Sequence, residues 1–500
     1  MPQPSNTDRR RFFIASGAIA ASVVAGSQSH AADPGILLRP GNRDLVRVRI
    51  ELEVKGNVNI PKNSLVSRQS SVKLPIQSDA VFDYEERYRR SPGAQPGSVV
   101  TAVERYYHEA KNRSQLNQSS HTQTLRDSVR ETVVRRDSLP EVIYGVEDFF
   151  ERDELELLRL PASSVAADEL LPGEKVVVGS KYRPDAQALM SVLNLTSVAA
   201  TDVEAEVVSI TDDAAKIQFK GKVDGSVDGV PTVIRTIGKL TFDRTVGTCT
   251  WLAMALHETR EIGKAEPGFD VAATIKMIRK PLDATIALAA TPPEMEVADA
   301  IPSDRLYVAL QSDQLDLRVL MDRRWRMMKD LPGAAMMRMI ENDRSIGQCD
   351  FRPLTSLSEG EQWTLQAFQA DVQGILGEQL DEFVEAEEQV SQSGMRVLRI
   401  VANGAVEGVP IRWVLLHLSD DSGRRILATF TMEGQNIDAF AGSDMQLAGT
   451  LRFNGSEQEN KSSPKEVALN SASCEANPRV AEAISDANSA TQVQSTNELR

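Results

Sequence analysis

Four histidines lie downstream of the N-terminal segment, and histidine is the side chain that most often serves as a general base or a metal ligand. They are His108, His121, His257 and His417. None belongs to an HxH or HExxH pattern, which would bring two imidazoles to one metal ion. His257 precedes Glu258, but consecutive residues of a strand point to opposite faces, which argues against a metal site formed by these two side chains. We therefore predict no metal site, a solvated strand end at His257, and a core or rim position with satisfied ring nitrogens for His417.

The chain has three cysteines, at positions 249, 349 and 474. An odd number allows at most one intramolecular disulfide and leaves at least one free thiol. We expect Cys249 and Cys349 to be small core residues on strands, with Cys474 as the exposed thiol. The alternative is that Cys349 is the nucleophile of a hydrolase.

Other catalytic and cofactor patterns are missing from the sequence. There is no G-x-S-x-G elbow and no nucleotide-binding glycine pattern. Asp224, Asp228 and Gly229 partly match a calcium loop but lack its ligand spacing and closing glutamate. The acidic run over residues 147–156 is typical of a solvated face. We predict no catalytic, cofactor-binding or metal-binding residues, and we expect Trp325, Trp363 and Trp413 to fill a core rather than form a ligand platform.

The overall charge limits the possible partners. Lys and Arg total 56 against 71 Asp and Glu, so the formal net charge is −15. Nucleic-acid binding needs clustered Lys and Arg, so nucleic acid is not expected as a partner.

Period-two alternation dominates the first half of the chain. Apolar residues alternate with charged residues from Val46 to Val54, and similar alternation follows at 72–76 and 80–88. More strand is expected at 99–137, with a polar loop at 112–120. Strands that follow one another without intervening helices form antiparallel sheets. A short helix is predicted at 184–195 with Pro184 in its first turn, followed by strands at 203–210, 215–223, 232–242, 248–258 and 272–279.

The strand from Thr248 is apolar on both of its faces. Cys249, Trp251 and Ala253 fall on one face, and Leu252 and Met254 on the other. This pattern predicts a central strand that is buried on both sides.

Two segments share a hairpin pattern. Residues 225–231 read GSVDGVP and residues 404–410 read GAVEGVP. The Asp-Gly and Glu-Gly pairs favour tight turns between two strands. Two convergent turns explain the similarity better than a duplication does.

The pattern changes after an Ala/Pro-rich linker at 284–302. Strands are predicted at 335–340 and 345–351. Ser358 and Glu361 form a capping box that predicts a helix to about Leu376. Strands follow at 395–402, 409–418 and 425–432, and a last helix is expected at 444–453. Residues 455–500 are polar and lack aromatic residues, which predicts a disordered tail.

The N-terminal residues 1–31 have the three-part layout of a secretory signal. They resemble the twin-arginine signal family, with Arg9 and Arg10 as the pair and Phe12 and Phe13 in the apolar positions. Ser29 and Ala31 fit a cleavage site after Ala31. The resemblance implies export to the periplasm or beyond, and no later segment is apolar enough for a transmembrane helix.

Two further resemblances concern the fold. By strand order and length, residues 33–283 resemble the half-barrel class of the periplasmic lipoprotein carriers, which implies a curved antiparallel sheet around helices. Residues 303–454 resemble the PsbP-like α+β fold through Arg324-Trp325, the hairpin ending in 345–349, the helix from Glu359 and the segment 410–413. In general style the chain also resembles exported proteins of the planctomycete type.

The sequence therefore predicts a β-rich α+β chain with a half-barrel-like domain followed by an α+β sandwich. The function it favours is that of an exported, non-catalytic binding or scaffolding protein, with a small apolar or lipid-like ligand in the curved sheet. The alternatives are a structural envelope or assembly protein that acts through protein contacts, and a hydrolase without a recognisable motif.

Overall fold

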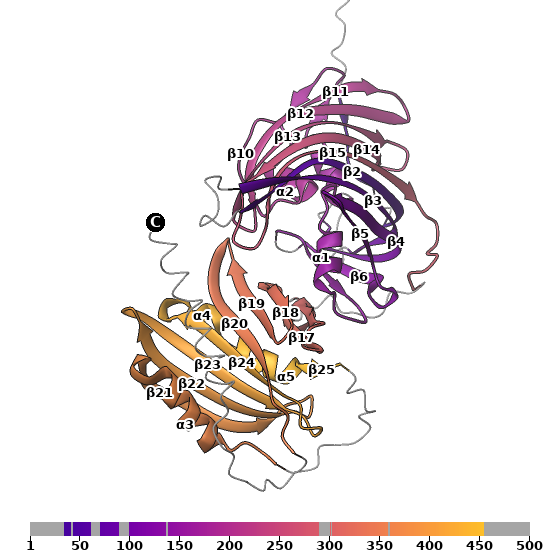
Figure 1. The fold of residues 1–500 in the computed structure, drawn as a ribbon. Coiled ribbons are helices and arrows are strands. Elements are labelled where there is room, and N and C mark those ends of the chain that lie inside the picture. Colours follow the sequence, from indigo (N-terminus) through magenta and orange to yellow (C-terminus); the bar gives the residue numbers. More distant parts are fainter. Residues whose placement is uncertain are drawn as a thin grey trace, which may run out of the picture.

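The structure is a computed structural model of the chain. It describes residues 35–41, 44–61, 71–89, 100–136, 139–289, 301, 303–358 and 361–454. The predicted twin-arginine signal, most of the predicted linker, Glu359, Cys474 and the predicted tail lie outside the described residues. The described chain is rich in antiparallel β-structure and has few helices (Figure 1).

The N-terminal part, residues 35–289, is built on a curved antiparallel sheet. Its strands pair in the order β7-β6-β4-β3-β2-β15-β14-β13-β12-β11-β9, while β10 pairs with β12 and β5 with β4. Among the described strands, the two at the ends of this order, β7 and β9, do not pair with each other, so the sheet is not closed on itself. The elements are β1 (Ile36–Leu37), β2 (Leu45–Pro61), β3 (Ser71–Arg89), β4 (Ala102–Leu116), β5 (Ser119–Thr124), β6 (Glu131–Arg135), β7 (Val142–Gly145), α1 (Arg152–Leu158), β8 (Lys175–Val176), β9 (Lys181–Tyr182), α2 (Ala186–Leu193), β10 (Ser197–Thr201), β11 (Glu204–Ile210), β12 (Ala214–Val227), β13 (Val230–Asp243), β14 (Thr248–Arg260) and β15 (Gly268–Pro281).

Alternation along β2 explains which face of this sheet is inside. Val46, Val48 and Ile50 are buried, while Arg49 and Glu51 between and beyond them are exposed. The antiparallel sheet and the strand predicted from residue 46 are confirmed. The predicted polar loop at 112–120 is wrong, because these residues continue β4 and turn at Asn117 into β5.

The segment 139–195, called the inner segment, contributes the edge strands β7 and β9 and packs its helical turns on the concave side of the curved sheet. It contributes α1, α2 and the 3-10 turn Ala166–Leu170, and its apolar residues join the same core as the strands. Figure 1 shows α1 and α2 inside the curve of the sheet. Helix α2 begins at Ala186 rather than at Pro184, because the Asp185 carboxylate accepts a hydrogen bond from Gln187 N at 2.7 Å and caps the helix.

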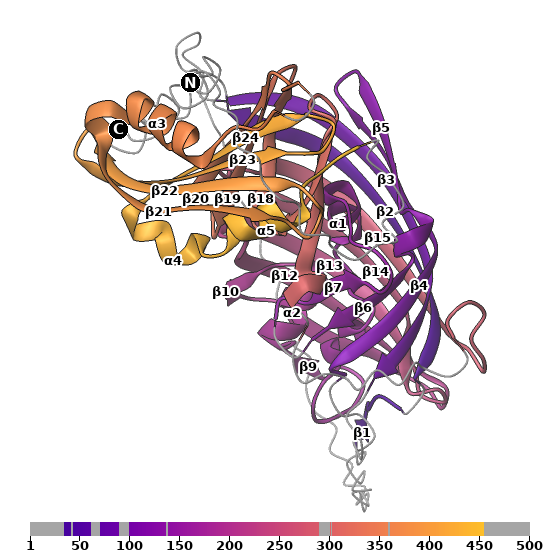
Figure 2. The ribbon, with the colours of Figure 1, turned by 90° about the horizontal axis from the view of Figure 1, so that it is seen from below.

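The C-terminal part, residues 303–454, has a seven-stranded sheet in the order β18-β19-β20-β24-β23-β22-β21 and a small sheet in the order β16-β17-β25. Helix α3 packs on one face of the large sheet, and α4, α5 and the small sheet pack on the other (Figure 2). The elements are β16 (Tyr307–Ser312), β17 (Leu317–Asp322), β18 (Trp325–Leu331), β19 (Ala334–Glu341), β20 (Arg344–Leu354), α3 (Leu365–Leu376), β21 (Leu380–Val390), β22 (Arg396–Val406), β23 (Val409–Ser419), β24 (Arg425–Glu433), α4 (Ile437–Phe440), α5 (Ser443–Thr450) and β25 (Arg452–Phe453).

Some predicted elements of this part need correction. Helix α3 begins at Leu365, where the Thr364 hydroxyl accepts a hydrogen bond from Ala367 N at 3.2 Å. The predicted capping residue Glu361 does reach Ser358 N, at 3.3 Å, but the two residues lie ahead of the helix. Strands β16, β17, β18 and β21 were not predicted.

The two repeated hairpin turns are confirmed. Asp228-Gly229 joins β12 to β13, and Glu407-Gly408 joins β22 to β23. All four residues have positive φ, between 49° and 86°, which is the conformation of a tight hairpin turn.

Candidate functional site

The structure does not bring the histidines together. His108 contacts Glu85 at 2.6 Å, and His257 contacts Asp270 at 3.0 Å, each on its own strand pair. Within the described ranges, no group of three or more His, Cys, Asp and Glu side chains is placed to hold a metal ion.

His417 lies in the core of the C-terminal part. Its ring packs against Trp363 at 5.1 Å and Phe368 at 6.1 Å between ring centroids. Both ring nitrogens are buried without a hydrogen-bond partner. The predicted core position is therefore correct, but the prediction that its nitrogens are satisfied is wrong. Burial, together with the positive charges of Arg425 and Arg396, lowers the pKa of His417 to about 3.

Cys249 and Cys349 are buried free thiols, as the core interpretation predicts. Burial raises the pKa of both thiols well above its ordinary value. A thiolate is the reactive form of cysteine, so neither residue has the surroundings of a nucleophile. The hypothesis of a Cys349 nucleophile is dropped. Trp325, Trp363 and Trp413 are likewise fully buried core residues.

The acidic run at 147–156 is not simply a solvated face. Glu154 is buried and pairs with Arg126 at 2.8 Å. It also accepts a hydrogen bond from Glu151 N at 2.8 Å, which closes the capping box of α1. Asp148 accepts a hydrogen bond from Arg126 as well. These carboxylates tie the start of α1 to the β5–β6 connection and are structural.

A buried polar cluster anchors the inner segment to the curved sheet. The Glu86 carboxylate accepts hydrogen bonds from Arg105 Nε at 2.8 Å and from Ser164 Oγ at 2.6 Å. Tyr84 donates to Ser164 Oγ at 2.9 Å. Sequence analysis missed this cluster because Ser164 is far from the strand residues in the chain.

A second anchor lies deeper in the curve. Arg279, which is fully buried, donates two hydrogen bonds to Asp168 at 3.0 Å and one to the Cys249 carbonyl at 3.1 Å. Asp168 belongs to the 3-10 turn of the inner segment. The buried Arg279–Asp168 ion pair and the hydrogen bond from Ser164 to Glu86 therefore hold this segment in place, and removing one partner of a buried ion pair is strongly destabilising.

One cavity inside the curved sheet is small. A cavity of about 70 Å³ lies beside Tyr84, Arg105 and Ser191. Engineered protein cavities that take up benzene measure about 150 Å³. A lipid does not fit this cavity unless the inner segment moves.

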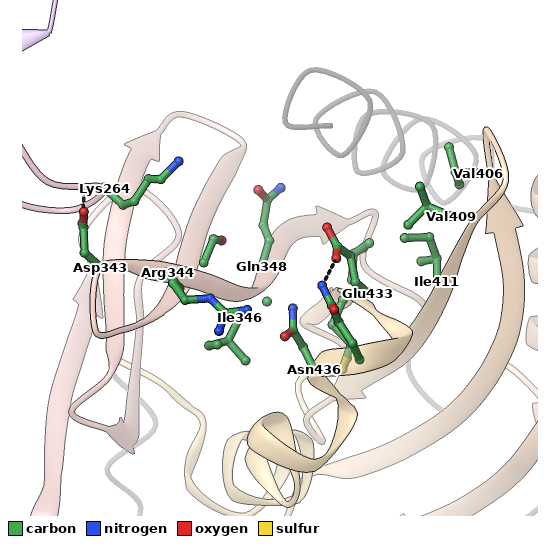
Figure 3. A pocket seen from close by; sticks show the side chains of 15 residues that line it. Lys264, Asp343, Arg344, Ile346, Gln348, Val406, Val409, Ile411, Glu433 and Asn436 are labelled. Atoms are coloured by element: carbon green, nitrogen blue, oxygen red, sulfur yellow. Dashed lines mark hydrogen bonds between the residues drawn. The ribbon is translucent and has the colours of Figure 1, made fainter. Parts of the chain in front are cut away.

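A larger pocket, the junction pocket, lies where the two parts meet. It has a volume of about 140 Å³ and is lined by Lys264 from the loop before β15 and by residues of β20, β22, β23, β24 and the 3-10 turn Gly434–Asn436. Figure 3 shows Lys264 and Asp343 at one end, and Val409 and Ile411 at the other. Asp343 accepts a hydrogen bond from Lys264 N at 2.5 Å, which fixes the loop against the β19–β20 turn.

The junction pocket combines polar and apolar walls. Ile411 and Met432 are buried apolar residues of the wall. Thr431 is only 4% exposed, and its hydroxyl has no hydrogen-bond partner within the described part of the chain. Asn436 is 9% exposed, and Figure 3 shows its amide between Gln348 and Glu433. A buried hydroxyl without a partner costs free energy unless a ligand or water satisfies it.

Gly347 leaves room in the same wall. A methyl group at this position would lie 3.5 Å from Thr431 O and 3.6 Å from Met432 Cβ, which are ordinary contacts. Alanine therefore fits without strain at this residue, which lines the pocket.

Charged residues dominate the contact between the two parts. Arg326 of the C-terminal part lies 3.9 Å from the Asp228 carboxylate, and Arg152 donates to the carbonyl of Arg323 at 3.0 Å. Burial and the nearby charges of Arg152 and Arg159 lower the pKa of Arg323 to about 10. A backbone hydrogen bond from Ala309 to Phe150 O, at 2.8 Å, completes the contact.

No protein-family profile matches the chain, and no curated protein matches its sequence. Three solved structures show low similarity. A protein from Bacteroides thetaiotaomicron has a TM-score of 0.22 and 12% identity, over 30% of this chain and 49% of its own. A point mutant of the protein Mog1 has a TM-score of 0.24 and 7% identity, over 29% of this chain and 95% of its own. Lipovitellin has a TM-score of 0.27 and 7% identity, over 51% of this chain and 27% of its own.

This chain thus spans about half of the Bacteroides protein. Similarities this low define neither a family nor a function. In the described part of the chain, no helix has the length and apolarity needed to cross a bilayer.

Proposed function

We propose that the protein is an exported, non-catalytic binding protein whose ligand occupies the junction pocket. The single observation that carries the proposal is a pocket of about 140 Å³ lined by Thr431, whose buried hydroxyl has no hydrogen-bond partner among the described residues. The ligand class is a small polar molecule with an apolar portion, because hydrogen-bonding groups and apolar side chains both line the wall.

The charged residues that line the pocket also support this ligand class. Lys264 and Arg344 provide positive charge, and Asp343 and Glu433 provide negative charge. Glu433 already accepts a hydrogen bond from Gln435 at 2.7 Å. A neutral or zwitterionic ligand suits such a balanced set better than a strong anion or cation does.

Variants of the paired strands β20 and β24 test the proposal. Native mass spectrometry of the purified full chain should detect a bound small molecule. Thr431→Val removes the hydroxyl and keeps the shape, so affinity should fall about 2- to 13-fold, the value of one hydrogen bond. Gly347→Ala should reduce binding further by occupying space. Thr429→Val is the matched control, because Thr429 is also buried with an unpartnered hydroxyl on β24 but does not line the pocket.

Retention of the ligand by Thr429→Val, with loss from the other two variants, supports the site. If no small molecule is bound, or if all variants bind equally, the proposal is wrong.

Export is the second component of the proposal. It is supported by Arg9, Arg10, Phe12 and Phe13 in the N-terminal segment. Replacing both arginines by lysine keeps the charge but removes the twin-arginine pair, so the protein should accumulate unprocessed in the cytoplasm. Immunoblots of fractionated cells measure this, with Arg11→Lys as the control. Normal export of the double variant would contradict the proposal.

The finer fold assignments are also part of the proposal. We assign residues 33–283 to the half-barrel class and residues 303–454 to the PsbP-like α+β class. The curved sheet around α1 and α2 supports the first assignment, and the packing of α3 on the large sheet supports the second. A lipid-like ligand in the curved sheet stays a prediction that requires displacement of segment 139–195.

A role as a structural envelope or assembly protein is the alternative. It is favoured by β21, an edge strand of the large sheet on which Val384 and Val390 are exposed. Exposed edge strands can pair with another chain. A stable protein partner in a pull-down, lost when Val384 is replaced by lysine, would favour this alternative.

A further inference from the structure

The outer face of β12–β15 is a cationic surface on an acidic protein. Five lysines of this face have no ion-pair partner among the described residues. By contrast, Lys222 of β12 has an ion-pair partner, and so do Lys73 of β3 and Lys181 of β9. The five are Lys216, Lys220, Lys239, Lys276 and Lys280, all of them exposed. Carboxylates border this surface on the neighbouring strands, with Glu204 opposite Lys220 and Glu51 opposite Lys276.

Large apolar side chains lie among these lysines. Trp251 is 38% exposed and stands opposite Ile278, which is 52% exposed, on the next strand. Ile237 is 58% exposed and stands opposite Lys220. Residues directly opposite on paired strands have neighbouring side chains, so apolar and cationic groups are interspersed over one continuous area.

This surface corrects the prediction that β14 is buried on both faces. A register shift between β13 and β14 places Cys249 on the inner face, and leaves Trp251 on the outer face with Ala255. The strand is central in its sheet, but no described element covers its outer side (Figure 1). The apolar residues that predicted burial are therefore available to a partner.

We propose that this face, the basic outer face, docks on the surface of a bilayer that contains anionic phospholipid. Charge complementarity is the first argument, since lysines near an anionic bilayer each strengthen binding about fivefold. The exposed tryptophan is the second, because its amphipathic ring favours the interface between headgroups and acyl chains. Isoleucines beside it add apolar area that can enter the same interface.

Vesicle co-sedimentation of the full chain tests the proposal. The probe is a vesicle of phosphatidylcholine with about one third phosphatidylglycerol, and pure phosphatidylcholine vesicles are the comparison. The chain should bind the anionic vesicles, and high salt should weaken this binding because it screens the charges. Lys239→Glu with Lys276→Glu should reduce binding by more than tenfold. Trp251→Ala should reduce binding several-fold without changing its dependence on salt.

The matched control is Lys175→Glu with Lys329→Glu, which makes the same change in net charge on β8 and β18. Circular dichroism and thermal melts establish that every variant is folded. Equal vesicle binding by both double variants, or no binding of the original chain to anionic vesicles, would overturn the proposal. Preferential binding of this face to heparin or to nucleic acid, with no binding to vesicles, would overturn it as well.

Discussion

At the scale of single residues, buried polar groups without partners are the most informative feature of this protein. Thr431 and His417 both belong to the large C-terminal sheet, and both have unpartnered polar atoms. Their surroundings differ, because Thr431 belongs to the wall of a pocket whereas His417 is packed against the aromatic rings of Trp363 and Phe368. The unpartnered hydroxyl of Thr431 therefore suggests a ligand, whereas the unpartnered nitrogens of His417 indicate only a cost in stability.

His417 should make the protein sensitive to acid. Its pKa is about 3 in the folded state, and that of a free histidine is about 6.5. Below pH 6.5 the unfolded chain binds a proton that the folded chain does not, so stability falls as the pH decreases toward 3. The slope is at most about 1.4 kcal/mol per pH unit.

His417→Leu should remove this contribution. The free energy of unfolding, measured by denaturant titration at pH 7 and pH 4.5, should depend less on pH in the variant. His121→Gln, which replaces an exposed imidazole, is the control. An unchanged pH dependence in His417→Leu would show that other groups cause the acid sensitivity.

At the scale of elements, the two repeated hairpins provide a matched comparison. Gly229 and Gly408 have nearly the same φ, 86° and 83°. A Cβ at Gly229 would lie 2.4 Å from the backbone of Asn342 in the other part, whereas a Cβ at Gly408 meets nothing within 4 Å. The first turn therefore belongs to the contact between the two parts, and the second does not.

Alanine substitutions should separate these roles. Gly408→Ala should cost about 1–2 kcal/mol, the strain of a left-handed conformation. Gly229→Ala should cost more, because it also pushes the two parts apart. Calorimetric melts of both variants measure the difference. Equal melting temperatures would mean that the turn of Gly229 does not contribute to the contact.

Much of the element order could be predicted because alternation and turn residues are local signals. Strand β2 and both hairpin turns follow directly from such signals. Strand β21 could not be predicted in this way. It is a largely exposed edge strand, so its sequence needs no apolar face and shows little alternation. The prediction that β14 is buried on both faces is wrong because the apolar residues of its outer face are exposed.

The candidate site could not be predicted from local patterns. Lys264, Gly347, Thr431 and Asn436 come from separate segments and belong to no motif. Only the fold brings them to one pocket, and only burial shows that the Thr431 hydroxyl has no partner. Sequence patterns carry neither kind of information.

At the scale of the whole molecule, a polar contact joins the two parts. Arg326 and Asp228 pair across it, and Arg323 is a buried cation with a lowered pKa. Contacts of this kind between domains are often weak enough to permit relative motion. A ligand in the junction pocket contacts both parts, so its binding should stabilise their arrangement.

A crystal structure of the full chain, purified under non-denaturing conditions, tests the central claim most directly. We predict density for a small non-protein molecule in the junction pocket, hydrogen-bonded to Thr431 Oγ1 and in contact with Lys264. A pocket that contains only water, or that a protein side chain closes by bonding to the Thr431 hydroxyl, would contradict the claim.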